Sequence, residues 1–400
     1  MSPPDRRALM PTYAAPPVTF VAGEGTVLYD DAGRRYLDFV GGLAVTSLGH
    51  AHPAVAAAVA EQARTLWHVS NLYGNELAPQ VALTIDRLIG GGDRQAGGQV
   101  FFANSGAEAN ECALKLARRW AGPGRHVVVS TNGAFHGRTL ATLTATGQPD
   151  KQAGFEPLPA GFVHVPYDDL AAMDRAVDPS RVGAVLLEPM LGEGGVVPPS
   201  EGYLAGVAAL CAGRGVLLVL DEVQTGFGRT GHWFAFQSAL GSQGSSPDVV
   251  TMAKALGNGM PVGACWARAE VAAAFSPGDH GSTFGGQPLA MAAVRATLEV
   301  MEAEDVPARA RRAGARLAEG LAGLPGVASV RGRGLLLAAV LAEPIAKERA
   351  AAALAAGLLV NPVRPDALRL APPLLVRDGE IDEALEILAS VLAAPMEGAR

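Results

Sequence analysis

Short runs of apolar, often β-branched residues recur through the middle of the chain, and most of them do not alternate with polar residues. Seven such runs are separated by helix-like or loop-rich stretches: Gln99–Ala103, His126–Ser130, Phe162–Val165, Ala184–Leu187, Leu217–Leu220, Asp248–Met252 and Gly263–Ala267. Strands of this kind are buried on both faces, which is typical of a parallel sheet covered by helices. We therefore predict an α/β fold with a largely parallel main sheet, which binds ligands beyond the carboxyl ends of its strands.

The two ends of the chain show different patterns. Residues 27–42 alternate around an Asp-Ala-Gly-Arg turn, which predicts a hairpin, and residues 52–66 predict a helix with Pro53 in its first turn. Residues 289–324 are helical in pattern, and strand-like and helix-like stretches then alternate up to a last helix over 380–392. We predict three parts: an N-terminal arm with strands over 1–48 that joins the small domain, a large domain over 49–290 and a smaller α/β domain over 291–400.

Composition narrows the class of protein. The 400 residues are 49% hydrophobic and 18% charged, which indicates a globular chain, and the net charge of -7 argues against nucleic-acid binding. The three cysteines lie far apart in apolar surroundings, so they form neither a disulfide framework nor a zinc site. The first 17 residues lack the apolar core of a signal peptide, and the longest uncharged apolar run, Ala350–Val360, falls short of the roughly 20 residues of a membrane span. We expect a cytoplasmic protein without metal, membrane or nucleic acid.

Glycine-rich polar clusters follow some of the predicted strands. In the segment NSGAEAN (104–110), Ser105 and Glu108 form a capping box, so a helix should begin there with a glycine in its first turn. Free N–H groups at such a helix start favour an anion, although an ordinary capped helix has the same residues. The segment GSTFGG (281–286) offers hydroxyls that suit phosphate oxygens, or is simply a turn.

Three further strand ends carry residues with chemical potential. Asp221 follows an apolar run, where a carboxylate needs a cationic partner unless it caps a loop. Lys254 is one of four lysines in a chain with 28 arginines, and lysine can form a Schiff base whereas arginine cannot. Phe135 and Arg138 could supply a stacking face and a carboxylate-binding fork, or a core ring and a solvated arginine. Together with the phosphate cradle, these are the parts that hold pyridoxal phosphate.

The sequence resembles the class III, pyridoxal-phosphate-dependent aminotransferases, and among them most closely the acetylornithine aminotransferases. The resemblance covers nearly the whole chain, through LYDDAGRRYLDFVGGLAVTSLGHAHP, HVSNLY, NSGAEANE, AFHGRTL, LEPMLGEGG, LDEVQTGFGRTG, MAKALGNGMPVGA, GDHGSTFGG, RGRGLLL and LRLAPPL. It implies the aspartate-aminotransferase-like fold (PLP fold type I), with a large domain around a seven-stranded, mainly parallel sheet and a smaller α/β domain. It also implies a homodimer whose active sites are shared between subunits.

The resemblance further implies roles for single residues. The cofactor-binding positions are matched by the lysine bonded to the aldehyde (Lys254), the partner of the pyridine nitrogen (Asp221), the neighbour of the ring hydroxyl (Gln224), the stacking ring (Phe135), the phosphate-binding backbone (Gly106 and Ala107) and a hydroxyl from the other subunit (Thr283). Lys254 and Asp221 are the catalytic pair. The substrate-binding positions are matched by Arg138 and Ser282 for the acylornithine, and by Glu193 and Arg369 as the switching salt bridge. Many relatives have Thr at position 107, so here backbone N–H groups must suffice.

The activity implied by the resemblance moves the terminal amino group of N2-acetyl-L-ornithine to 2-oxoglutarate, in arginine biosynthesis. Other ω-aminotransferases remain open, with ornithine, succinylornithine, N-succinyl-diaminopimelate or 4-aminobutyrate as donor. The acidic net charge disfavours an enzyme acting on an acidic carrier protein. An aminomutase would leave the Glu193–Arg369 pair idle, and a cofactor-free binding protein would not need Lys254, Asp221 and Phe135 together.

Overall fold

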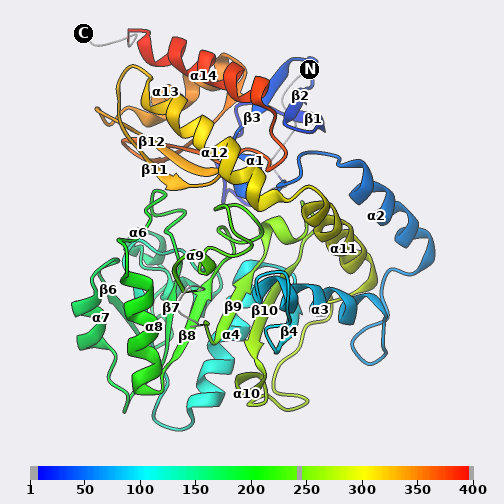
Figure 1. Ribbon diagram of the computed structural model, residues 1–400, viewed down its shortest axis with the longest axis vertical. Helices are drawn as coiled ribbons and strands as arrows, with labels where there is room; N and C mark the ends of the chain where they lie inside the picture. Colours follow the sequence, from blue (N-terminus) through cyan, green and yellow to red (C-terminus); the bar gives the residue numbers. More distant parts are fainter. Residues whose placement is uncertain (1–7, 241–245, 396–400) are drawn as a thin grey trace.

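The computed structural model describes residues 8–240 and 246–395, so residues 1–7 of the predicted arm and the last five residues of the predicted C-terminal domain lie outside it. Its largest element is a seven-stranded sheet in the order β4-β10-β9-β8-β7-β5-β6 (Figure 1). The strands are β4 (Gly98–Ala103), β5 (Val127–Thr131), β6 (Phe162–Val165), β7 (Val182–Leu187), β8 (Leu217–Asp221), β9 (Val249–Met252) and β10 (Gly263–Arg268). All seven predicted strands are confirmed. Only β10 runs antiparallel to its neighbours in this sheet, so the predicted, largely parallel arrangement is also confirmed.

Helices cover both faces of this sheet. The helices of this part of the chain are α2 (Pro53–Thr65), α3 (Leu77–Ile89), α4 (Gly106–Ala121), α5 (Leu140–Ala145), α6 (Pro149–Gln152), α7 (Leu170–Ala176), α8 (Tyr203–Arg214), α9 (Gln237–Leu240), α10 (Ala269–Ala272) and α11 (Pro288–Ala303). Of these, α2 packs on α11, α6 on α5 and α9 on α8. Successive residues of β8 point to opposite faces: Leu218 and Leu220 pack in one apolar cluster with side chains of α8, whereas Leu217 and Val219 pack in another with side chains of α4. Burial on both sides explains why these strands lack polar alternation.

Two smaller sheets lie beside the large one. One has the order β1-β2-β3-β13 and the other β11-β12-β15-β14, formed by β1 (Phe20–Glu24), β2 (Val27–Asp30), β3 (Arg35–Asp38), β11 (Val327–Arg333), β12 (Leu336–Leu341), β13 (Leu358–Leu359), β14 (Asn361–Arg364) and β15 (Ala367–Leu370). The predicted hairpin is β2–β3, and the Asp30 carboxylate closes its turn by accepting the N–H groups of Ala32 at 3.0 Å and Arg34 at 2.8 Å. Because β3 pairs with β13, the N-terminal strands lie among C-terminal elements (Figure 1). The three-part division of the chain stays a prediction.

The C-terminal helices differ from the pattern in one respect. The helical stretch expected over 289–324 is two helices, α11 and α12 (Val306–Ala322), because Asp305 has a left-handed backbone (φ 43°) and caps α12 through the N–H of Ala308. The strand-like segment 329–340 is a hairpin of β11 and β12, and α13 (Ala346–Ala355) and α14 (Asp378–Ala393) follow. Among the described residues, no helix has the length and apolar character needed to cross a membrane.

Candidate active site

A cavity of about 380 Å³ lies at the carboxyl edge of the seven-stranded sheet, where the predicted ligand site should be. Eight of the predicted site residues line it: Gly106, Ala107, Phe135, Arg138, Glu193, Asp221, Gln224 and Lys254. They come from the end of β8 and from the segments that follow β4, β5, β7, β8 and β9, and they are separated by up to 148 positions in the sequence. The parallel strands therefore bring these segments together.

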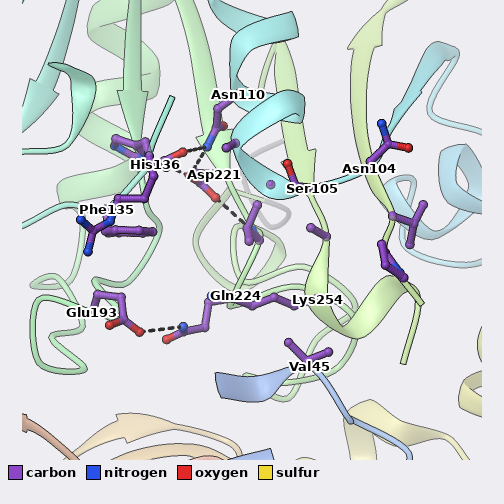
Figure 2. A pocket seen from close by; sticks show the side chains of 18 of the residues that line it. Val45, Asn104, Ser105, Asn110, Phe135, His136, Glu193, Asp221, Gln224 and Lys254 are labelled. Atoms are coloured by element: carbon purple, nitrogen blue, oxygen red, sulfur yellow. Dashed lines mark hydrogen bonds and ion pairs between the residues drawn. The ribbon is translucent and has the colours of Figure 1, made fainter. Parts of the chain in front are cut away.

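Asp221, the last residue of β8, is a buried acid of the cavity. Its Oδ2 atom accepts hydrogen bonds from Asn110 Nδ2 and from His136 Nδ1, both at 2.8 Å (Figure 2). The Asn110 amide also donates to the carbonyl of His136 at 2.8 Å, so the three residues form one closed network. This network holds the carboxylate in place at 4% exposure. A carboxylate fixed in this way can stabilise a positive charge placed in the cavity.

Lys254 lies just past the end of β9, at the start of a short 3₁₀ turn, η2 (Lys254–Leu256). Its backbone is left-handed (φ 44°), a conformation that costs a residue with a side chain roughly 1–2 kcal/mol. Burial lowers the pKa of the Lys254 amine, although the negative charge of Glu193 opposes the shift. Since the neutral amine is the nucleophile, this environment favours covalent chemistry at Nζ.

The first turn of α4 borders the same cavity. Ser105 caps the helix by accepting the N–H of Glu108 at 3.2 Å, as predicted, and the Glu108 carboxylate reaches back to the N–H of Asn104 at 2.9 Å. A side chain at Gly106 would require Val223 to shift, because a Cβ atom there would lie 2.9 Å from a methyl group of Val223. First-turn N–H groups have no partner within their helix, so this turn can bind an anion.

Phe135 and Glu188 lie on the loops that follow β5 and β7. The N–H of Phe135 donates to Glu188 Oε1 at 2.8 Å, and the N–H of Gly192 donates to Oε2 of the same carboxylate at 2.9 Å. Burial raises the pKa of Glu188 to about 7, against the opposing effect of His136. Arg138 is exposed, and its guanidinium lies 5.7 Å from the centre of the Phe135 ring. The buried Glu188 carboxylate thus fixes the backbone of Phe135, and the exposed Arg138 lies near its ring.

Glu193 and Arg369 form the predicted ion pair, with Arg369 Nη1 and Glu193 Oε1 2.6 Å apart. Arg369 comes from β15 and is 2% exposed, and it also donates to Gln224 Oε1 at 3.1 Å and to Asn361 Oδ1 at 2.8 Å. Figure 2 shows the Gln224 amide reaching Glu193. Burial works to raise the pKa of Glu193, but the positive charges of Arg369 and Lys254 outweigh this effect and lower that pKa. The pair is therefore charged, and only Glu193 lines the cavity.

Ser282 and Thr283 do not join the other predicted residues in the single chain. They line a second cavity of about 310 Å³ together with Glu108 and Phe284. Asn104 lines both cavities, and its amide donates to Ser282 Oγ at 3.2 Å, so the two cavities adjoin. In this chain the two hydroxyls lie beside the Lys254 cavity and outside its lining.

Sequence reasoning did not single out Asn110, His136 and Glu188, which all line the Lys254 cavity. Asn110 lies one turn beyond Gly106 on α4 and His136 follows Phe135, but nothing in the sequence shows that both converge on Asp221. Glu188 had a usable signal, because it follows the apolar run Ala184–Leu187 as Asp221 follows its own run. A carboxylate at the end of either buried strand needs a partner for the same physical reason.

Residues 10–392 match the model of the family described as aminotransferase class-III. Fold, cavity and sequence therefore define a transaminase: the chain belongs to the class-III aminotransferases, which use pyridoxal 5'-phosphate.

Relatives in this family share much of the sequence. The chain is 50% identical to the acetylornithine aminotransferase of Mycolicibacterium smegmatis, over 97% of each chain. It is 48% identical to the acetylornithine aminotransferase of Corynebacterium efficiens, over 97% of this chain and 95% of the relative. A crystal structure of ornithine aminotransferase from Toxoplasma gondii ME49 superposes with a TM-score of 0.89 at 34% identity, over 97% of this chain and 93% of the other.

The cavity fits this cofactor. It contains a half-buried amine at Lys254, a fixed carboxylate at Asp221, an aromatic ring at Phe135 and the start of a helix at Gly106. These groups match an aldehyde, a pyridine nitrogen, a flat ring and a phosphate, respectively.

Proposed function

We propose that this enzyme transfers the terminal amino group of N2-acetyl-L-ornithine to 2-oxoglutarate, yielding N-acetyl-L-glutamate 5-semialdehyde and L-glutamate, in arginine biosynthesis. The observation that carries the proposal is the Glu193–Arg369 pair at the cavity of Lys254. The reacting carbon of the acylornithine bears only hydrogens, whereas that of 2-oxoglutarate bears a carboxylate. One site must therefore hide a cation in the first half-reaction and expose it in the second.

In this proposal Glu193 covers Arg369 while the acylornithine reacts. It moves aside when 2-oxoglutarate or glutamate brings a carboxylate of its own to the buried guanidinium. Arg138, on the exposed side of the Phe135 ring, binds the distal carboxylate in both half-reactions through its two-pronged fork. The same pocket then serves two substrates whose reacting ends differ in charge.

The remaining residues hold the cofactor and move the proton. Pyridoxal phosphate supplies an electron sink next to the carbon that bears the amine. Lys254 is the proposed covalent attachment point; where the amine of the substrate has replaced it there, its Nζ would be free to take the proton from that carbon. Asp221 keeps a proton on the pyridine nitrogen, Phe135 covers one face of the ring, and the backbone N–H groups of Gly106 and Ala107 bind the phosphate.

We also propose a cytoplasmic homodimer in which Thr283, and with it Ser282, completes the site of the other subunit. The position of both hydroxyls supports this: they line an adjoining cavity and not the cavity of Lys254 in their own chain. Mixing subunits that carry Lys254→Ala with subunits that carry a disruptive Thr283→Trp substitution should restore activity that neither variant has alone. Failure of the mixture to recover any activity, with subunit exchange demonstrated, would refute shared sites.

A donor panel tests the reaction itself. With 2-oxoglutarate as acceptor, kcat/KM should be highest for acetylornithine, compared with succinylornithine, ornithine, N-succinyl-diaminopimelate and 4-aminobutyrate. The purified protein should be yellow, and its absorbance should change when acetylornithine is added. A clear preference for ornithine would replace the proposal with the ornithine-specific alternative, and a colourless protein that takes up no cofactor would reject both.

A further inference from the structure

Glu188 is a buried acid of the cavity to which the proposed function gives no role. It follows β7, and the pairing of Leu187 with Leu220 places it beside Asp221 at the carboxyl edge of the sheet. Its side chain is 6% exposed and lines the cavity. Both of its oxygens accept backbone N–H groups, from Phe135 at 2.8 Å and from Gly192 at 2.9 Å.

These two donors belong to two different parts of the site. Phe135 carries the ring that faces the cavity, and Gly192 directly precedes Glu193. Gly192 also lies against Gln224, because a Cβ atom there would be 2.1 Å from Gln224 Oε1. Since Gln224 hydrogen-bonds both Glu193 and Arg369, a shift of Gly192 must also disturb the ion pair.

We propose that Glu188 is a positioning residue that ties the stacking ring of Phe135 to the loop of the Glu193 switch. One carboxylate accepts the N–H groups of both loops. The position of Glu193 against Arg369 therefore depends on the same group that positions the Phe135 ring. This inference rests on the proposed function, because it assigns Glu188 a part in choosing between the two substrates of that reaction.

Glu222 is a matched control for a purely structural role. It is buried too, at 0% exposure, and burial raises its pKa to about 7 as well. Its carboxylate accepts hydrogen bonds from Thr225 Oγ1 and from the N–H of Phe236 at 2.9 Å, and it does not line the cavity. A Gln substitution therefore removes a buried acid at either position, but only at Glu188 does it release the two loops.

The test compares Glu188→Gln and Glu222→Gln as holoenzymes. An amide has a single acceptor oxygen, so Glu188→Gln can hold only one of its two N–H donors. We measure the absorption maximum of the bound cofactor and the single-turnover rates with acetylornithine and with L-glutamate. Glu188→Gln should move the absorption maximum and shift the ratio of the two rates about tenfold towards glutamate, the effect of losing one hydrogen bond to a charged acceptor. Glu222→Gln should change the melting temperature and leave both readouts at the wild-type values.

Several outcomes overturn the inference. They are an unchanged rate ratio in Glu188→Gln, a ratio change without a spectral change, or the same changes in Glu222→Gln. If Glu188→Gln gives no folded holoenzyme, Glu188→Asp keeps both oxygens but withdraws them by one methylene, and it must shift the ratio in the same direction. A wild-type enzyme that does not react with acetylornithine rejects the proposed function separately, and the ratio is then measured with its true donor against glutamate.

Discussion

Replacing Glu193 with Gln tests the proposed substrate switch directly. The substitution keeps the shape of the side chain but removes the negative charge that lies 2.6 Å from Arg369 Nη1. Arg369 keeps its hydrogen bonds to Gln224 and Asn361, which are both neutral. Its guanidinium, 2% exposed, then has no anionic partner in the residues that the structure describes.

The size of the effect follows from this geometry. A buried charge that loses its partner is unfavourable, and the carboxylate of an α-amino acid can take the place of Glu193. A hydrogen bond to a charged group contributes about 2 kcal/mol, and Glu193 no longer has to be displaced to form it. The ratio of kcat/KM for glutamate over acetylornithine should therefore rise by about 30-fold, since each 1.4 kcal/mol corresponds to about tenfold.

The assay follows each half-reaction of the holoenzyme through the absorbance of the cofactor, with acetylornithine or glutamate as the only substrate. Glu201→Gln, at an exposed acid outside the cavity lining, is the control and should keep the wild-type ratio. A Glu193→Gln enzyme with the wild-type ratio, or with a ratio shifted towards acetylornithine, would show that the ion pair does not select between the substrates.

Three further substitutions test separate parts of the reasoning. Lys254→Arg keeps the charge but removes the amine, so borohydride reduction and peptide mapping should label Lys254 in the wild type and nothing in the variant; a label on another residue contradicts the assignment. Asp221→Asn should slow both half-reactions about 100-fold or more by single-turnover measurement, because it removes a preorganised charge, and unchanged rates would exclude this role. Burial raises the pKa of Glu222 from 4.5 to about 7, so its contribution to stability is complete below pH 4.5 and is lost as the pH rises through about 7. Glu222→Gln should thus gain about 3 kcal/mol over wild type between about pH 4.5 and pH 8, and a difference in melting temperature that does not change with pH contradicts this.

The sheet could be predicted closely because the burial of its strands leaves a local signal. The inner strands are apolar on both faces, as Leu217 to Leu220 show, and they are bounded by turn or helix signals. The break between α11 and α12 was less visible, since Asp305 interrupts the helical period for only about a turn. A single left-handed residue leaves almost no trace in a hydrophobic pattern.

Contacts between distant side chains could not be predicted from the hydrophobic pattern. The bonds from Asn110 and His136 to Asp221 join residues up to 111 positions apart, and they depend on the exact register of α4 and of the loop after β5. The resemblance supplied Glu193 and Arg369 as a pair, although they are 176 positions apart. The resemblance did not point to Glu188. Its partners are backbone N–H groups, so the side chains of the partner residues give no sign of the contact.

The chemistry of this site follows from where two neighbouring parallel strands end. Because β7 and β8 are in register, each ends in an acid at the same edge: Glu188 after Leu187 and Asp221 after Leu220. Their hydrogen bonds differ, since side chains of Asn110 and His136 hold Asp221, whereas two loop backbones meet at Glu188. In the proposed function, the first arrangement presents a carboxylate to the cofactor ring, and the second ties the Phe135 loop to the Glu193 loop. Two acids at one sheet edge can thus serve two purposes in the proposed function. Asp221 stabilises the positive charge of the cofactor ring, and Glu188 links the position of that ring to the residue that selects the substrate.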